Sequence, residues 1–145
     1  MKLKARNKVD FNRTHTQKGK EDRIRRYSKG ECFLEQPVED IIDAGYYQLM
    51  RFWLIGAWIA EKQNLNFYLL NLVRENDEKH IEMEFGEYIR QNEKRRFLRL
   101  AWENIYKYIS ATDLFSEDKN KILEYLENKT VGYYRNELRK AFSIP

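Results

Sequence analysis

The longest apolar stretch of the chain runs from residue 38 to residue 64, directly after Pro37. Apolar side chains occupy most of the circumference of the helix that this stretch would form, as in a helix buried in a protein core. Carboxylates stand in the first turns, where the helix dipole favours negative charge: Glu39, Asp40 and Asp43. We therefore predict one helix from Val38 to Asn64, with Gly56 allowing another element to approach it closely.

Residues 67–73, FYLLNLV, form a second apolar run with polar residues on both sides. Seven residues suit a strand better than a helix, and an almost unbroken apolar run is typical of a strand covered on both faces. Residues 76–91 then place apolar side chains at helical spacing, namely Ile81, Phe85, Tyr88 and Ile89. This part of the chain predicts a central strand followed by a helix.

Residues 95–109 fit two patterns. One is a strand over 95–101 that leads into a helix beginning near Trp102. The other is a single continuous helix, because one helical stripe contains Leu98, Ala101, Trp102, Ile105 and Ile109. We favour the strand followed by the helix.

The last part of the chain predicts a helix that begins at Ser116, a residue well suited to cap a helix. A turn at Gly132 and a closing segment anchored by Leu138 and Phe142 follow. Helices thus alternate with strands along the chain, which indicates an α/β fold with a mixed sheet flanked by helices. An all-helical bundle is the alternative.

The N-terminal 30 residues lack steady apolar periodicity and predict a basic arm, in which residues 20–30 form at most one short helical turn. Residues 31–37 are apolar and end at Pro37, which indicates an edge strand or a packed loop. We expect residues 31–145 to form a single α/β domain.

The composition excludes several classes of protein. Apolar residues make up 42% of the chain, too many for a disordered protein. Cys32 is the single cysteine and there are two histidines, so neither a disulfide framework nor a zinc site is expected, and a reducing cytoplasmic setting fits. Arg51 interrupts the most apolar segment, so no membrane span is expected, and the first 20 residues lack the apolar core of a secretory signal.

The charge is unevenly distributed. Residues 1–30 contain eleven lysines and arginines against three acids, a local charge of +8, whereas the other 115 residues carry −4. A basic arm ahead of a mildly acidic body indicates an anionic partner, most often nucleic acid. The alternative is a solvated tail that increases solubility.

Gln48 and Arg51 are polar residues within the apolar 38–64 segment. On a helical wheel one face, about 60° wide, contains Ala44, Gln48, Arg51, Ile55 and Lys62. This face either meets solvent or lines a cleft. In a cleft, Gln48 would orient a reacting group and Arg51 would bind a phosphate through two hydrogen bonds, so we take both as candidate catalytic residues.

The segments AGYYQLMRFWLIGAWIAEK (44–62) and NFYLLNLV (66–73) together resemble the C-terminal half of PD-(D/E)XK nucleases, the restriction-endonuclease-like superfamily. In that family a helix with a glutamine near its start follows the catalytic strand and precedes a buried strand. The resemblance covers residues 40–145 and implies a restriction-endonuclease-like sheet. It carries one site residue over to this chain, Gln48.

The same family uses an Asp and a Glu-x-Lys motif to hold Mg²⁺ for phosphodiester hydrolysis. In this chain Pro37 stands where the lysine would follow Glu35, and Glu31 and Asp10 also lack the motif. The resemblance thus implies a fragment or degenerate relative that binds nucleic acid, DNA rather than RNA, and uses Mg²⁺ only if active. A second copy of the chain, or an upstream catalytic partner that supplies the missing motif, is the expected protein partner.

Two groups of basic residues are candidates for nucleic-acid binding. One lies near residue 25 and contains Arg23, Arg25, Arg26 and Lys29. The other lies in the 95–101 strand and contains Arg95, Arg96 and Arg99. Strand alternation would place Arg95, Phe97 and Arg99 on one face, a mixture of basic and aromatic side chains suited to single-stranded nucleic acid.

Two other functions remain open. Arg74 and His80 resemble the Arg-x(4–6)-His pattern of the helical HEPN ribonucleases, which implies metal-independent RNA cleavage with His80 as acid and base. The third possibility is a partner-binding domain without catalysis. Glu78 and Glu82 share a helical face, but no second helix offers the Glu-x-x-His motif of a di-iron site, so no metal ligand is expected.

Overall fold

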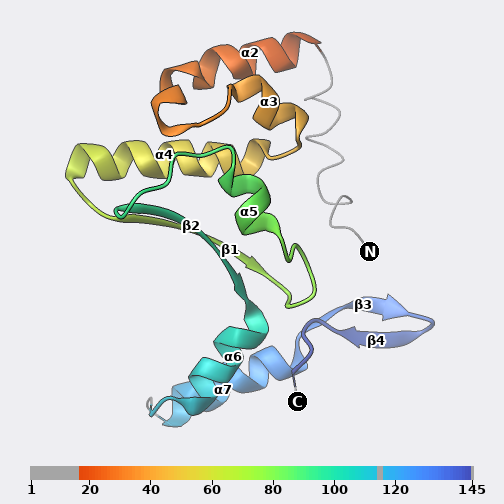
Figure 1. Cartoon of the computed structure of the whole chain (residues 1–145). Coiled ribbons are helices and arrows are strands. Elements are labelled where there is room, and N and C mark those ends of the chain that lie inside the picture. The colour runs from red at the N-terminus through yellow and green to blue at the C-terminus, as the bar shows by residue number, and fades with distance from the viewer. Residues whose placement is uncertain (1–16, 114–115, 145) are drawn as a thin grey trace. The chain divides into compact units, whose positions relative to one another are not determined.

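The computed structural model describes residues 17–113 and 116–144 (Figure 1). The helices are α2 (Gln17–Tyr27), the 3-10 helix η2 (Ser28–Phe33), α3 (Val38–Asp43), α4 (Tyr47–Gln63), α5 (Ile81–Gly86), α6 (Trp102–Ala111) and α7 (Ser116–Asn128). The strands are β1 (Phe67–Val73), β2 (Arg95–Ala101), β3 (Thr130–Tyr134) and β4 (Glu137–Lys140). The parts of the basic arm before residue 17 lie outside the described residues.

The described residues divide into two compact units. The first contains the residues through Leu69 together with Met83–Arg96, and the second contains Leu70–Glu82 and the residues from Phe97 onward. The division passes through β1 and β2, which pair in a two-stranded parallel sheet, whereas β3 and β4 form a separate antiparallel sheet. The mixed α/β class is confirmed, and the alternative of an all-helical bundle is wrong.

The predicted helix over residues 38–64 is wrong as a single element, because it is divided into α3 and α4. Gly45 has a φ of +88°, which is compatible with glycine but interrupts a right-handed helix, and its N–H donates to the carbonyl of Ile42 at 3.0 Å. The second helix then ends where expected, with Asn64 in the left-handed region at φ 51°.

Residues 17–27 form the 11-residue helix α2, so the single short turn expected over 20–30 is wrong. The Lys20 ammonium binds the carboxylates of Glu39 and Asp43 at 2.8 Å each, which fastens α2 to α3. The boundary expected at residue 30 lies within η2. Residues 31–33 belong to η2, and the residues after it form the packed loop that was one of the two expectations for 31–37: Leu34 is buried and makes an isolated antiparallel bridge to Ile89, and the edge strand is wrong.

The core of the first unit is built around α4. Its buried side chains are Met50, Trp53, Leu54, Ala57 and Ala60. The Trp53 side chain is fully buried, its indole N–H donates to the carbonyl of Phe33 at 2.9 Å, and its ring lies 5.5 Å from that of Phe67. The Phe67 ring packs directly against Gly56, which confirms the close approach expected at this glycine.

Replacing Gly56 with alanine is expected to destabilise the protein by about 1–3 kcal/mol. A Cβ at this position would lie 2.1 Å from Cζ of the Phe67 ring, so the ring that packs against Trp53 must move. Urea denaturation followed by tryptophan fluorescence measures the loss. Gly86→Ala is the control for added bulk, because a Cβ there would meet only the far end of the flexible Gln91 side chain, at 3.2 Å; equal losses in the two variants would contradict a steric cause.

The FYLLNLV segment is a strand, as predicted, but it is not covered on both faces. Alternate side chains, Tyr68, Leu70 and Leu72, are about half exposed. The helix predicted over 76–91 is also shorter, since α5 spans six residues and follows a loop in which Glu78 has a φ of 49°.

In the second unit, β2 ends at Ala101 and α6 begins at Trp102, which confirms the strand followed by a helix. The predicted helix from Ser116 is confirmed as α7. The turn expected at Gly132 is wrong, because that residue lies inside β3 and the hairpin turns at Arg135 and Asn136, with φ of 50° and 66°. The expected anchor Leu138 is 56% exposed, so that prediction is wrong.

Glu103 on α6 is a buried carboxylate that joins two backbone segments of the second unit. One oxygen accepts the N–H of Glu75 at 2.8 Å and the other accepts the N–H of Ser143 at 3.1 Å. The neighbouring Trp102 ring lies 5.8 Å from that of Phe142 and secures the same C-terminal segment.

Glu103→Gln is expected to destabilise the protein by about 1–3 kcal/mol, because an amide nitrogen cannot accept one of the two N–H groups. Thermal denaturation checks this, with Glu124→Gln on α7 as the control for loss of an exposed carboxylate. A Glu103→Gln variant as stable as the control would show that the buried oxygens contribute nothing.

Candidate nucleic-acid interface

Three arginines and two tyrosines of the first unit meet where α2 lies near the start of α4. We call this group the arginine–tyrosine cluster: Arg23, Arg26, Tyr27, Tyr47 and Arg51. The Arg23 guanidinium lies over the Tyr47 ring, with its Cζ 4.4 Å from the ring centroid. The hydroxyl of Tyr47 donates to that of Tyr27 at 3.5 Å, and the two rings meet edge to face with centroids 5.9 Å apart.

The helical spacing of the sequence creates this cluster. Arg23, Arg26 and Tyr27 are three and four residues apart, so they share one face of α2. Tyr47 and Arg51 are likewise one turn apart on α4. The ion pairs of Lys20 with α3 hold the face of α2 in place, and a cation stacked on a tyrosine ring adds about 0.5–1 kcal/mol.

The cluster is electrostatically positive. Burial raises the pKa of Tyr27, the hydrogen bond from Tyr47 raises it further, and the charges of Arg51 and Arg26 act in the opposite direction. The net direction is upward, so the Tyr27 phenol stays neutral and protonated at physiological pH. Within residues 17–113 and 116–144, no carboxylate pairs with Arg23, Arg26 or Arg51. Three positive charges therefore lie together without a neutralising carboxylate from these described ranges.

One donor of the cluster is buried and unsatisfied. In the part of the chain that the structure describes, Nη1 of Arg23 has no hydrogen-bond partner, although buried polar atoms in native proteins nearly always have one. An anionic oxygen placed among the guanidinium and hydroxyl groups would accept this hydrogen bond. The arrangement suits a phosphate group, which arginine binds through two parallel N–H donors.

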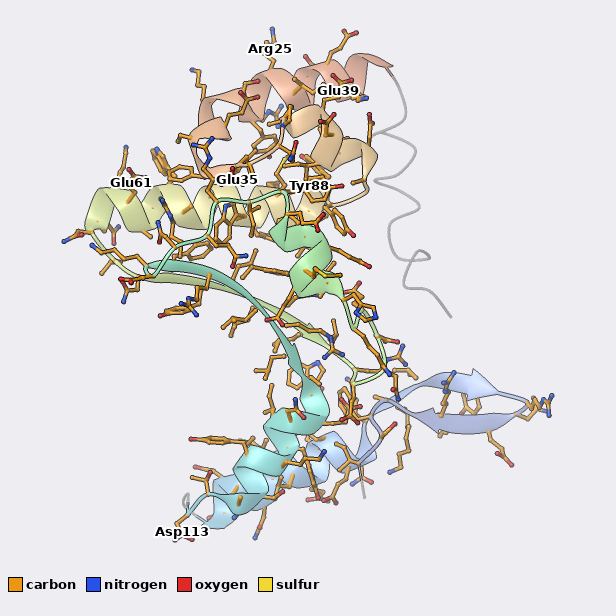
Figure 2. The ribbon with its side chains drawn as sticks, in the orientation of Figure 1. Arg25, Glu35, Glu39, Glu61, Tyr88 and Asp113 are labelled. Carbon is orange, nitrogen blue, oxygen red and sulfur yellow. The ribbon has the colours of Figure 1, made fainter. Side chains whose placement is uncertain are left out.

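The structure separates the basic residues near position 25 into two sets. Arg23 and Arg26 belong to the cluster, whereas the Arg25 side chain is 85% exposed, points away from the rest of the unit and pairs with Asp22 at 3.1 Å (Figure 2). Lys29 lies exposed in η2. Of the two candidate catalytic residues, Arg51 is in the cluster and Gln48 is half-buried beside Tyr47; a role in catalysis stays a prediction for both.

In the first unit, Arg95 and Arg96 of β2 have different environments. The Arg95 side chain is 20% exposed, binds Glu61 at 3.2 Å and lies with its Cζ 4.8 Å from the Phe33 ring centroid. Arg96 is exposed. Arg95 thus contributes to packing, so we leave it out of the proposed interface and keep Arg96 as an accessible candidate.

In the second unit, the Arg99 guanidinium is surrounded by backbone carbonyls of the loop that follows β1. Its Nε donates to Asp77 at 3.1 Å, and its Nη2 donates to Arg74, Glu75 and Asp77 at 3.1, 2.7 and 2.8 Å. These contacts hold the loop and give Arg99 an internal role, so we leave it out of the interface as well.

The same loop contains the residues of the HEPN-like hypothesis. Arg74 pairs with Asp77 at 2.7 Å, and His80 is exposed. Both lie between a strand and a short helix, whereas that hypothesis implies an all-helical protein. Among the residues that the structure describes, no group of three or more His, Cys, Asp or Glu side chains is placed to hold a metal ion. In the same part of the chain, no helix has the length and apolar character to cross a membrane.

Comparisons with protein-family models, curated proteins and solved structures give no significant match. The resemblance to PD-(D/E)XK nucleases therefore stays a hypothesis from the sequence. The two tyrosines of the cluster are absent from the sequence prediction, because Tyr27 lies on a helix that was not expected and Tyr47 joins the site only through its contact with Tyr27 and Arg23 on that helix. Arg23 and Tyr27 are four residues apart in the sequence. Had a helix been predicted over residues 17–27, this spacing would have placed the two side chains on one face.

Proposed function

We propose that this chain binds nucleic acid through the arginine–tyrosine cluster. The observation that carries the proposal is the convergence of Arg23, Arg26 and Arg51, which have no carboxylate partner among the described residues, together with the buried Nη1 of Arg23, which has no hydrogen-bond partner among those residues. Most protein contacts to DNA are made to phosphate and sugar by groups of this kind, and they position the protein without reading sequence. The hydroxyl of Tyr27, which accepts the hydrogen bond from Tyr47, adds an uncharged donor to the same site.

The proposed ligand is DNA, held by its phosphates. The aromatic rings of the cluster lie against one another and against Arg23, so the guanidinium edges and hydroxyl groups are the parts offered to a ligand. These groups recognise phosphate oxygens in any base sequence. We expect binding that depends strongly on salt and weakly on sequence.

Kinship with PD-(D/E)XK nucleases is the second part of the proposal, and it concerns binding by a degenerate relative. Mg²⁺ in such enzymes is held by carboxylates, and the cluster offers none; Pro37 also occupies the position of the motif lysine after Glu35. The residues present therefore do not fit a catalytic metal at this site. Cleavage would require a metal-binding motif supplied from elsewhere.

Fluorescence anisotropy with a labelled 20-base-pair duplex tests the proposal. Arg23→Gln and Arg51→Gln are each expected to weaken binding by about tenfold or more, since a charge-assisted hydrogen bond contributes about 1.5–3 kcal/mol. Arg25→Gln is the matched control, because Arg25 lies on the same helix outside the cluster. It should bind within about twofold of the wild type. Equal losses of DNA affinity in all three variants would indicate that only the total charge matters. That result would contradict a binding site at the cluster.

A further inference from the structure

Helix α4 has a second apolar face that the first unit leaves exposed. Phe52, Ile55 and Ile59 are 50%, 48% and 41% exposed, although the opposite side of the same helix is fully buried. A surface helix normally directs polar side chains outward, and contiguous exposed apolar residues mark interaction sites. We call these three residues the α4 row.

The spacing of the α4 row is that of a helix–helix seam. The three residues are separated by steps of three and four, and the same alternation continues to Gln48 before them and Lys62 after them. Apolar residues at this spacing occupy the a and d positions of a heptad and interlock with a second helix. Binding to a flat protein surface would not require apolar residues at alternating spacings of three and four. The spacing of the α4 row therefore indicates that its partner is a helix.

Positive charge borders the row on one side. The Arg51 Cζ lies 5.3 Å from the centroid of the Phe52 ring, and the Lys62 Nζ lies 3.9 Å from that of the Trp58 ring. Helix α4 has one carboxylate, Glu61, which helical spacing places on the side opposite the row and which is engaged by Arg95 at 3.2 Å. In an antiparallel pair of two α4 helices, the cations of the two copies would lie beside each other. The border therefore disfavours a second copy and complements carboxylates.

We propose that the α4 row binds an amphipathic helix of another protein, in which glutamates or aspartates flank an apolar a/d stripe. The partner's apolar side chains would cover Phe52, Ile55 and Ile59, and its carboxylates would pair with Arg51 and Lys62. Charges at the flanking positions of paired helices select the partner and its orientation. This surface is independent of the proposed nucleic-acid contacts except at Arg51.

Two synthetic peptides test the proposal with the full chain. Both have four heptads with leucine at a and d; one has glutamate at e and g, and the matched peptide has lysine there. The glutamate peptide should bind at least tenfold more tightly in a fluorescence anisotropy titration. Ile59→Glu should reduce its affinity at least tenfold, whereas Ile122→Glu, at a half-exposed isoleucine of α7, should leave it within about twofold.

Lys62→Glu is the second variant, because it changes an exposed residue and leaves the apolar row intact. It should weaken the glutamate peptide and strengthen the lysine peptide. Equal affinity for the two peptides, or no binding of either, would overturn the proposal. So would a wild-type dimer in analytical ultracentrifugation that Ile59→Glu dissociates, because the occupant would then be a second copy. A tenfold loss of duplex DNA affinity in Ile59→Glu would instead assign the row to nucleic acid.

Discussion

Replacing Trp53 with alanine is expected to destabilise the protein by about 3–5 kcal/mol, a loss typical of deleting a buried aromatic side chain. Trp53 is fully buried at the centre of the first unit, and its removal leaves a cavity beside Phe67. It also leaves the carbonyl of Phe33 without the indole N–H at 2.9 Å. Urea denaturation followed by circular dichroism measures the change in the free energy of unfolding.

Trp58→Ala is the matched control for this prediction. Trp58 lies on the same helix and is the same residue type, but its side chain is 52% exposed. Its loss should cost less than about 1 kcal/mol, because surface substitutions have small effects. Comparable losses at the two positions would contradict the assignment of one face of α4 to the core.

Arg99→Met is expected to destabilise the loop after β1 by on the order of 3 kcal/mol, since hydrogen bonds to a charged group contribute about 1.5–3 kcal/mol each. The guanidinium satisfies carbonyls of three residues: Arg74, Glu75 and Asp77. The backbone N–H of Arg99 also donates to Glu82 at 2.9 Å, a contact that the methionine variant retains. Hydrogen exchange at the amides of residues 74–80 should accelerate at least tenfold.

Arg96→Met, three residues earlier on β2, is the control for removal of a positive charge. Arg96 is exposed, so its replacement should leave exchange in the loop unchanged. If Arg99 acted instead as a nucleic-acid ligand without a structural role, its variant would retain loop protection and lose only DNA affinity. That result would restore Arg99 to the interface.

The secondary structure could be predicted well where local periodicity decides it. FYLLNLV as a strand, the change from strand to helix at Trp102 and the helix from Ser116 all follow from spacing and capping. The break between α3 and α4 did not, because it depends on the positive φ of Gly45, and a lone glycine in a helical pattern is usually tolerated. The hairpin turn also depends on two residues with positive φ, Arg135 and Asn136, which carry a weaker signal than Asn-Gly.

The features that the sequence did not predict, namely helix α2, the composition of the site and the exposed face of β1, depend on tertiary contacts. Residues 17–27 are strongly polar, and α2 is held by the ion pairs of Lys20 with α3, which single-segment patterns do not show. The same limitation affects the site. The sequence indicated that arginines matter, but it could not distinguish Arg23, stacked on Tyr47, from Arg99, which is bound to carbonyls of its own chain. An apolar run likewise cannot show that one face of β1 stays exposed.

The dependence of DNA affinity on salt tests the central proposal most directly. For B-DNA, the slope of log K against log salt concentration is about −0.9 for each phosphate neutralised. The variant that combines Arg23→Gln, Arg26→Gln and Arg51→Gln should therefore have a slope shallower than that of the wild type by about 2–3, while Arg25→Gln retains the wild-type slope. Identical slopes for the triple variant and the wild type would contradict binding of DNA by the arginine–tyrosine cluster.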